Sequence, residues 1–329
     1  MAYSTVRRLG LISLLLAACG DASTGHDETA STAQGVVFGS ESGGDDDGVV
    51  LLDLGSSHAL CSGVLVHSRV VLTARHCLSH VGEGLFTCRE DGALAFRSDQ
   101  GGTFLTDRPP SEVRVFTGSQ KPSIDQPPSA IGKAIVHDDA PFICGHDIAA
   151  LILDRPMAAR KFDIRSQPVA PHEPLRLVGW GFDESGTRAS SRRSRGNIPV
   201  SRLGPAPAAE PHHATITANE FDFGEGACDG DSGGAVLDVS GALVGIVSRG
   251  DGAARELGGA HCFGPDAQTV ASSIAVHEAR IRGWIAPVHA EAGRAGDGGC
   301  STGGSMRRPN VSWYGVLMLL CCILARRRT

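Results

Sequence analysis

Short apolar runs separated by turn residues recur along the middle of the chain. Examples are Val49-Val-Leu-Leu52, Val70-Val-Leu72 and Leu243-Val-Gly-Ile-Val247. Runs of this length, with no sustained helical periodicity between them, are typical of β-strands. The pattern therefore predicts an all-β fold, either a barrel or a sandwich.

Length and composition agree with this expectation and exclude one class of partner. The chain has 329 residues, enough for one large domain or two modest ones, and contains 43 Gly but only 5% aromatic residues. Its formal net charge is −6, so it lacks the basic footprint expected of a nucleic-acid-binding protein. We expect no nucleic-acid partner.

The N-terminal residues 1–19 have the features of an export signal. A basic pair, Arg7 and Arg8, precedes the apolar run 9–18, which is too short to span a bilayer comfortably. Leu16-Ala-Ala-Cys19 resembles a bacterial lipobox, which would place a lipid on Cys19; ordinary cleavage after a small residue is the alternative. Residues 20–35 are small, polar and acidic, and we expect a flexible leader or propeptide there.

The C-terminal end predicts a sorting or anchoring signal. Residues 289–305 form a Gly/Ala linker that contains Cys300, and 306–329 hold a short apolar run followed by an Arg cluster. This order resembles the MYXO-CTERM class of bacterial surface-sorting tags, which are cut near the Cys. A simple C-terminal anchor is the alternative. We expect a bacterial exported protein, either held at the outer membrane or cell surface or secreted.

Six of the ten Cys lie in the predicted globular region. In an exported protein they predict three disulfides, with fifteen possible connectivities. A metal site is disfavoured because the globular region has no Cys-x-x-Cys pair, and we expect neither a metal nor a cofactor. These six residues are Cys61, Cys77, Cys88, Cys144, Cys228 and Cys262.

The stretch Gly230-Asp-Ser-Gly-Gly234 offers a small hydroxyl among residues that tolerate tight backbone turns. Such a backbone can aim several N–H groups at one point beside the Ser232 side chain. Acyl transfer needs this combination of a nucleophilic oxygen and preorganised donors. A plain turn is the alternative reading of the pentapeptide.

A base and an orienting acid are also present. The stretch Val70-Val-Leu-Thr-Ala-Arg-His-Cys77 predicts a strand that ends at His76, and Asp147 leads directly into another apolar run. A carboxylate there would be buried and would need a partner such as an imidazole N–H. His137 and His146 are rival bases without the same context.

Residues Val36-Val-Phe-Gly-Ser40 form either a first strand or a new N-terminus created by cleavage after Gly35. In the second case the freed ammonium could insert and pair with a buried carboxylate, and Asp231 is the candidate. Because burying either charge alone is costly, such a pair works as an activation switch.

Together these motifs resemble the trypsin-like (chymotrypsin-fold) serine endopeptidases. They occur in the family's order of base, acid and nucleophile. The resemblance implies two packed antiparallel β-barrels with a short C-terminal helix over residues 36–288. The matching pieces are Val36–Ser40, Leu72–Cys77, Asp147–Leu151, Val178–Gly181, Cys228–Gly234 and Gly245–Ser248.

The resemblance also implies a role for each motif residue. Ser232 would be the nucleophile, His76 the general base and Asp147 the group that orients His76. The N–H groups of Gly230 and Ser232 would form the oxyanion hole, and Ser248 would support Asp147. The implied disulfides are Cys61–Cys77 and Cys228–Cys262, which leaves Cys88 to pair with Cys144.

The primary pocket departs from that of trypsin itself. The position of trypsin's pocket Asp holds Gly226, followed by Ala227, so this position does not support a preference for Arg or Lys. Arg249 stands where the family has a Trp, and Asp266 lies where a shortened loop could bring it to the pocket. The expected substrate contacts are Gly226, Ala227, Asp229, Ser248, Arg249 and Gly250.

The sequence thus predicts a secreted or surface-anchored serine endopeptidase made as a zymogen, acting on protein or peptide substrates. It would need an activating protease (or autoactivation) and the export and sorting machinery, and we expect a monomer. A catalytically silent protein-binding module with the same fold is the alternative. An esterase elbow is disfavoured because its triad order places Ser first and His last.

Overall fold

The computed structural model describes residues 36–55, 59–123, 125–209, 214–251, 262–264 and 267–296. The predicted export signal, leader and C-terminal sorting segment lie outside these residues. So do Cys19, Cys300 and Asp266. The interpretations attached to them remain predictions.

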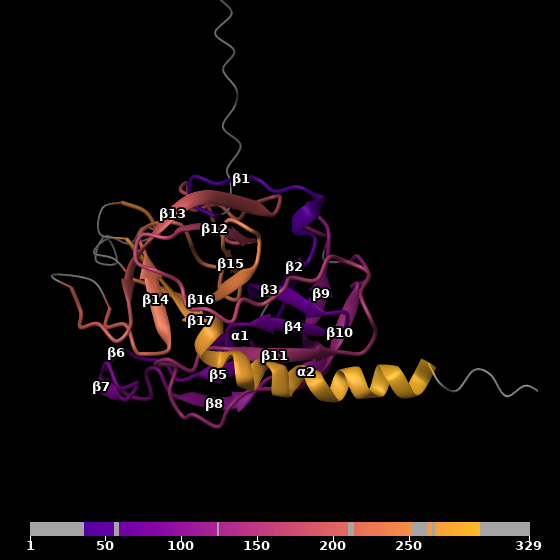
Figure 1. Ribbon diagram of the computed structural model, residues 1–329, viewed down its shortest axis with the longest axis horizontal. Helices are drawn as coiled ribbons and strands as arrows, with labels where there is room; N and C mark the ends of the chain where they lie inside the picture. The colour runs from indigo at the N-terminus through magenta and orange to yellow at the C-terminus, as the bar shows by residue number, and fades with distance from the viewer. Residues whose placement is uncertain are drawn as a thin grey trace, which may run out of the picture.

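The described chain is built mainly from short β-strands, with one long helix at its C-terminal end (Figure 1). The strands are β1 (Ser40–Glu41), β2 (Val49–Asp53), β3 (Leu60–His67), β4 (Val70–Thr73), β5 (Ser79–Val81), β6 (Phe86–Cys88), β7 (Leu94–Arg97), β8 (Phe104–Asp107), β9 (Arg114–Phe116), β10 (Ala130–Val136), β11 (Ala149–Leu153), β12 (Pro174–Gly179), β13 (Arg193–Leu203), β14 (Glu220–Phe223), β15 (Ala235–Leu237), β16 (Leu243–Asp251) and β17 (Gln268–Ser273). The helices are η1 (Gly44–Asp46), α1 (Arg75–Leu78), η3 (Pro110–Glu112) and α2 (Ile274–Gly296).

Two antiparallel barrels account for most of the strands. The first is a closed barrel with the order β10-β11-β4-β3-β2-β9. The second sheet has the order β1-β13-β12-β15-β16-β17-β14, and an additional pairing of β13 with β14 closes six of its strands into a ring. The predicted all-β, two-barrel architecture is confirmed.

The continuous apolar runs have a simple structural cause, which β2 illustrates. Val49 and Leu51 belong to a hydrophobic cluster that contains residues of both barrels, whereas Val50 and Leu52 belong to the cluster of the first barrel alone. Because successive side chains of a strand point to opposite faces, both faces of β2 are buried. A strand buried on both sides shows no alternation of polar and apolar residues.

The stretch from residue 82 to 130, rich in Gly and Pro, combines strands of two small sheets with a strand of the first barrel. Its strands β6 and β7 pair with each other and β8 pairs with β5, whereas β9 is one of the barrel's own strands. The disulfide between Cys88 in β6 and Cys144 ties this region to the segment before β11.

A polar stretch for which no strand was predicted contains the longest strand, β13. The Arg193–Leu203 sequence has few apolar residues, so its pattern gives little sign of burial. Arg192, just before it, is fully buried, and its guanidinium donates to the Ser42 hydroxyl and to the carbonyls of Gly118 and Gly43. Partnered guanidinium groups therefore replace part of the apolar core here.

The helix α2 begins at Ile274 and ends at Gly296, so it extends beyond residue 288 into the range predicted as a linker. Ile274, Ile281 and Val288 are buried in the cluster that both barrels share. In Figure 1 the helix runs along the lower side of the barrels and projects past them. Among the described residues, no helix is long and apolar enough to cross a membrane.

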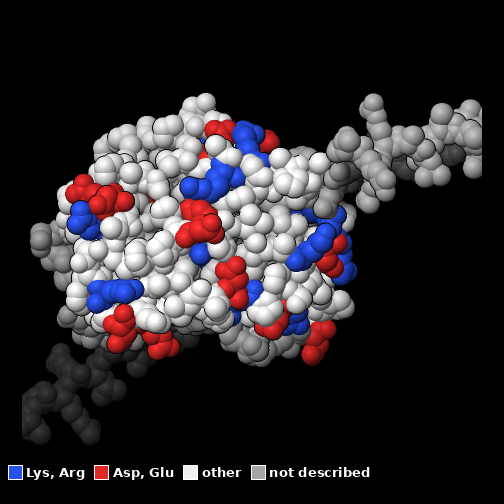
Figure 2. Space-filling view, turned by 90° about the horizontal axis from the view of Figure 1, so that it is seen from below, with Lys and Arg blue, Asp and Glu red and all other residues white. Residues whose placement is uncertain are grey.

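Acidic and basic side chains are interspersed on the face shown in Figure 2, and neither sign forms a continuous field there. This distribution is that of an ordinary solvated surface.

Candidate active site

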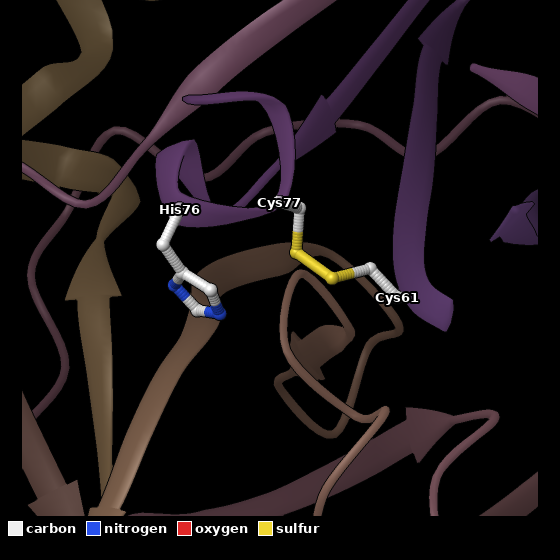
Figure 3. A group of neighbouring side chains, drawn as sticks. All are labelled: Cys61, His76 and Cys77. Atoms are coloured by element: carbon white, nitrogen blue, oxygen red, sulfur yellow. A yellow bond between two sulfur atoms is a disulfide. The ribbon is translucent and has the colours of Figure 1, made fainter. Parts of the chain in front are cut away.

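His76 lies on the one-turn helix α1, directly after β4. The strand ends at Thr73, earlier than the predicted strand that ran to His76, and Ala74 connects it to the helix. The next residue, Cys77, forms a disulfide with Cys61 of β3, and Figure 3 shows the ring and the disulfide leaving the same turn. The histidine is thus held on a short helix fixed to the first barrel.

These same three residues are the one group of potential metal-ligand atoms found within the described part of the chain. The side-chain donor atoms of Cys61, His76 and Cys77 lie within 4.8 Å of one another. The two sulfur atoms are bonded to each other, however, and a disulfide cannot supply the thiolates that bind a metal ion. The group therefore does not fit a metal centre.

Asp147 binds His76 at two points and is completely buried. One carboxylate oxygen lies 2.7 Å from His76 Nδ1, and the other accepts a hydrogen bond from the His76 backbone N–H at 2.9 Å. The first oxygen also accepts the hydroxyl of Ser248 at 2.7 Å. These contacts fix the imidazole so that Nε2 is left for other partners.

The electrostatics of the pair follow from this geometry. Burial alone would raise the pKa of Asp147, but the charge of His76 and the hydrogen bonds hold that pKa below its ordinary value. Burial alone would lower the pKa of His76, yet Asp147 raises it above the ordinary value, against opposing charges on Arg249 and Arg108. The carboxylate stays ionised beside a histidine that can accept a proton.

The two rival histidines have other partners. His137 Nε2 lies 3.0 Å from a carboxylate oxygen of Asp107, and His146 Nδ1 lies 2.7 Å from Asp138. His76 alone of the three is paired with Asp147 in the described structure.

The Ser232 turn packs directly against the residues that lead to His76. The Ser232 carbonyl accepts the N–H of Ser62 at 2.8 Å and lies 3.7 Å from Cys77 Sγ. Gly233 has φ of +82°, and a Cβ there would lie 2.1 Å from the Ser62 carbonyl oxygen and 3.1 Å from the Ala74 nitrogen. Only glycine allows so close an approach.

Among the described residues, no hydrogen bond joins the Ser232 hydroxyl to the His76 ring. Catalytic hydrogen bonds often tighten only when substrate is bound, so we expect this one to form in the substrate complex.

Two backbone N–H groups near Ser232 are oriented by the carbonyls of their own peptide units. The Asp229 carbonyl accepts the N–H of Phe182 at 2.8 Å, and the Asp231 carbonyl accepts the N–H of Gly234 at 2.7 Å. Because a trans peptide places N–H and C=O on opposite sides, the N–H groups of Gly230 and Ser232 face away from these contacts. Within the described residues neither N–H donates a hydrogen bond.

Asp231 lies in a pocket of backbone donors and meets the start of the described chain. Its carboxylate accepts N–H groups from Gly181 at 2.8 Å, from Cys228 at 2.9 Å and from Val36. Burial raises the pKa of Asp231 to about 7 in spite of these hydrogen bonds. Both Val36 and Asp231 are fully buried.

The residues expected to contact substrate are spread over two elements. Gly226 and Ala227 are buried before the Ser232 turn, and a Cβ at Gly226 would lie 3.3 Å from a Leu177 methyl group. Asp229 and Gly250 are exposed, whereas Arg249 forms an ion pair with Glu220. Among the described residues the disulfides are those that the resemblance implied: Cys61–Cys77, Cys88–Cys144 and Cys228–Cys262.

Two polar residues of the site were missed from the sequence. Ser62 joins the barrels, because its hydroxyl donates to the Gly230 carbonyl and accepts the N–H of Trp180, both at 3.0 Å. Glu220 is buried between the Asp147 segment and β16. The sequence feature that could have indicated them is that each is a polar residue inside or beside an apolar run.

Comparisons with known proteins point to one family. The family model described as Trypsin matches residues 37–263. The cercarial protease of Schistosoma mansoni is 30% identical over 60% of this chain and 73% of its own length. Lectizyme of Glossina austeni is 27% identical over 72% of this chain and 80% of its own length. A vitellin-degrading protease of Bombyx mori is 28% identical over 59% of this chain and 68% of its own length.

Proposed function

Because the chain belongs to the trypsin family of serine proteases, we propose that it is a serine endopeptidase that hydrolyses protein or peptide substrates through Ser232, His76 and Asp147. The support is the pairing of His76 with a buried Asp147 and the packing of the Ser232 turn against the same segment.

The proposed reaction has two halves. The Ser232 oxygen attacks the scissile carbonyl while His76 Nε2 takes the hydroxyl proton, and this proton is then delivered to the leaving amine as the C–N bond breaks. Water attacks the resulting acyl-enzyme, again with His76 as base, and the acid product leaves as Ser232 regains its proton. Asp147 stabilises the imidazolium in both halves.

The strongest support for the proposal is that, among the described residues, the backbone N–H groups of Gly230 and Ser232 have no hydrogen-bond acceptor. A buried or half-buried amide without an acceptor is costly unless a ligand supplies one. The oxygen of a tetrahedral intermediate would supply it, and losing one such donor typically costs about 100- to 1000-fold in rate.

We further propose that cleavage after Gly35 activates a zymogen. In the intact chain the Val36 nitrogen meets Asp231 as a neutral amide. Cleavage would turn the same nitrogen into an ammonium, which would compensate the buried carboxylate. Export through residues 1–19, with a lipid on Cys19, and sorting through the C-terminal segment near Cys300 belong to the same proposal.

Substitution of the nucleophile tests the proposal. Protein cut before Val36 is assayed for peptide hydrolysis as wild type, as Ser232→Ala, and as Ser240→Ala, which changes an exposed serine in a turn of the second barrel. We expect Ser232→Ala to lose at least about 10⁴-fold in kcat/KM and Ser240→Ala to keep wild-type activity. Unchanged hydrolysis by Ser232→Ala, with a native Tm, would refute the proposal and favour a binding module.

A further inference from the structure

The buried ion pair between Glu220 and Arg249 lies next to the proposed triad without belonging to it. Glu220 begins β14 with a fully buried side chain, and Arg249 of β16 has only 14% of its side chain exposed. The Arg249 guanidinium donates to both carboxylate oxygens, at 2.6 Å and 3.1 Å. Such a two-point contact fixes orientation as well as distance.

The same carboxylate holds the segment that carries the proposed acid. One oxygen of Glu220 accepts the N–H of Gly145 and the other accepts the N–H of Thr217, each at 3.0 Å. Gly145 is two residues before Asp147, and Asn219 Nδ2 donates to its carbonyl at 3.1 Å. The backbone just before Asp147 is thus held by Glu220, the first residue of β14, and by Asn219 immediately before it.

Arg249 is also next to Ser248, the second residue that holds Asp147. It follows Ser248, whose hydroxyl donates to Asp147. Glu220 therefore joins, through one carboxylate, the strand that carries Ser248 and the segment that carries Asp147. Its two oxygens have four donors in total, so the carboxylate is fully engaged as an anion.

Stability alone is a weak explanation for this pair. Removing two charges from water is costly, and replacing a buried ion pair by packed apolar residues is often neutral or stabilising.

We propose that Glu220 and Arg249 are positioning residues that hold Asp147 and Ser248 in place and set the basicity of His76. The inference rests on the proposed function, since it assigns the pair a role in the triad's geometry. Neither residue is a catalytic residue, because neither touches the atoms that react.

The electrostatic part of the proposal has a definite sign. Burial lowers the pKa of His76 and Asp147 raises it, and among the other charged groups Arg249 from β16 and Arg108 from the segment after β8 lower it. Losing the Arg249 cation therefore raises the pKa of His76. Losing the Glu220 anion leaves that cation uncompensated and lowers the pKa.

Paired substitutions separate this role from a structural one. The acid limb of kcat/KM against pH reports the base in the free enzyme. We expect the limb to move to higher pH in Arg249→Met and to lower pH in Glu220→Gln. It should return toward its wild-type position in the double variant. The plateau of kcat/KM should fall about ten- to a hundredfold in all three, because the support of Asp147 is weakened.

Two further variants complete the test. Arg249→Lys keeps the charge but not the two-point contact, so its acid limb should stay near that of wild type while its plateau falls. Arg176→Met is the control, because Arg176 of β12 makes a similar two-point contact with the buried Asp46. It should lower Tm and leave both limb and plateau unchanged.

The outcome that overturns the inference is an acid limb that does not move, with losses no larger than those of Arg176→Met. Titration of the His76 ring by NMR in the same cleaved proteins gives the same opposite shifts without relying on turnover. If the wild type shows no turnover, the proposed function has failed, and the NMR shifts still decide the role of the pair. If Arg249→Met does not fold, Glu220→Gln and Arg249→Lys decide it.

Discussion

At the scale of single residues, the most informative group is the Asp231 carboxylate. It is fully buried, and in the intact chain its partners are neutral N–H donors. Burial raises its pKa to about 7, so around neutral pH this carboxyl group is protonated in part of the intact molecules. The missing cation is what cleavage before Val36 would provide.

This carboxylate predicts an unusual pH dependence of the intact precursor. The unfolded chain loses the Asp231 proton near pH 3.8, whereas the folded chain keeps it to about pH 7. Folding stability should therefore fall as pH rises through this window, by about 4 kcal/mol in total, and change little above it. Urea unfolding at pH 5 and pH 8 measures the part of this loss that falls between pH 5 and pH 7, about 3 kcal/mol.

The control is Asp231→Asn, which removes the titrating group and should remove most of this dependence. Cleaved protein should also show less of it, because the ammonium of Val36 holds the carboxylate ionised. The difference in unfolding free energy between the precursor and Asp231→Asn should change between pH 5 and pH 8. An unchanged difference would contradict the raised pKa of Asp231.

The Asp147 contacts lead to a second prediction at this scale. In Asp147→Asn the side chain has only one oxygen, so it cannot accept both the backbone N–H and the Nδ1–H of His76. An amide NH₂ facing Nδ1 would favour the tautomer with its proton on Nε2, which cannot act as the base, so kcat should fall by about 10⁴. His146→Ala is the matched control, because His146 is paired with Asp138, and it should retain most activity. Similar losses in both variants would argue against a special role for Asp147.

At the scale of elements, the Cys88–Cys144 disulfide connects the small β6–β7 sheet with the segment that leads to Asp147. Its two cysteines are 56 residues apart, against 16 for Cys61 and Cys77. The entropy of loop closure makes the longer link the more stabilising one.

Replacing both cysteines of the longer link by Ala should therefore lower the free energy of unfolding by about 4 kcal/mol, and replacing Cys61 and Cys77 by about 3 kcal/mol. Urea unfolding of the cleaved protein measures both. The first change should also lower kcat/KM, because it frees the segment before Asp147. A larger loss of stability from the shorter link would show that local packing outweighs the entropy of loop closure.

At the scale of the whole molecule, the site lies where the two barrels meet. The first barrel leads into α1 with His76 and contributes Ser62, and the second barrel contributes the turn of Ser232 and the Ser248 strand. The hydrophobic cluster shared by both barrels and α2 fixes their arrangement. Cleavage before Val36 would act on the second barrel, through Asp231.

This arrangement predicts a strong dependence of activity on processing. Replacing residues 31–35 by a recognition sequence for a site-specific protease gives a precursor that is cut before Val36 on demand. Activity should rise at least about 100-fold on cutting, as for a site that moves from a minor to a major population. Asp231→Asn should lose this gain, and full activity of the uncut precursor would contradict the zymogen proposal.

The features that could be predicted from sequence were those held in short motifs. The pairing of His76 with Asp147 and the contact of Val36 with Asp231 followed from motifs whose order resembles one family. The strands β2 and β4 were recognisable because burial on both faces gives continuous apolar runs. Their partners in the sheets came with the resemblance.

The features that could not be predicted depend on polar contacts between distant segments. The strand β13 was missed because its sequence is polar, and Arg192 just before it is buried against carbonyls that only the fold brings near. The contact of Arg249 with Glu220, 29 residues away in sequence, is of the same kind. No periodicity records such a pair, since each residue alone reads as a solvated charge.

Mass spectrometry after treatment with a fluorophosphonate, a reagent that modifies activated serines, tests whether Ser232 is the nucleophile of the cleaved protein. The full chain is analysed before and after cleavage at Val36, beside Ser232→Ala. We expect an adduct on Ser232 in the cleaved species alone, and none in Ser232→Ala. A cleaved, folded protein that carries no adduct at Ser232 would contradict the account and leave a protein-binding module with a protease fold.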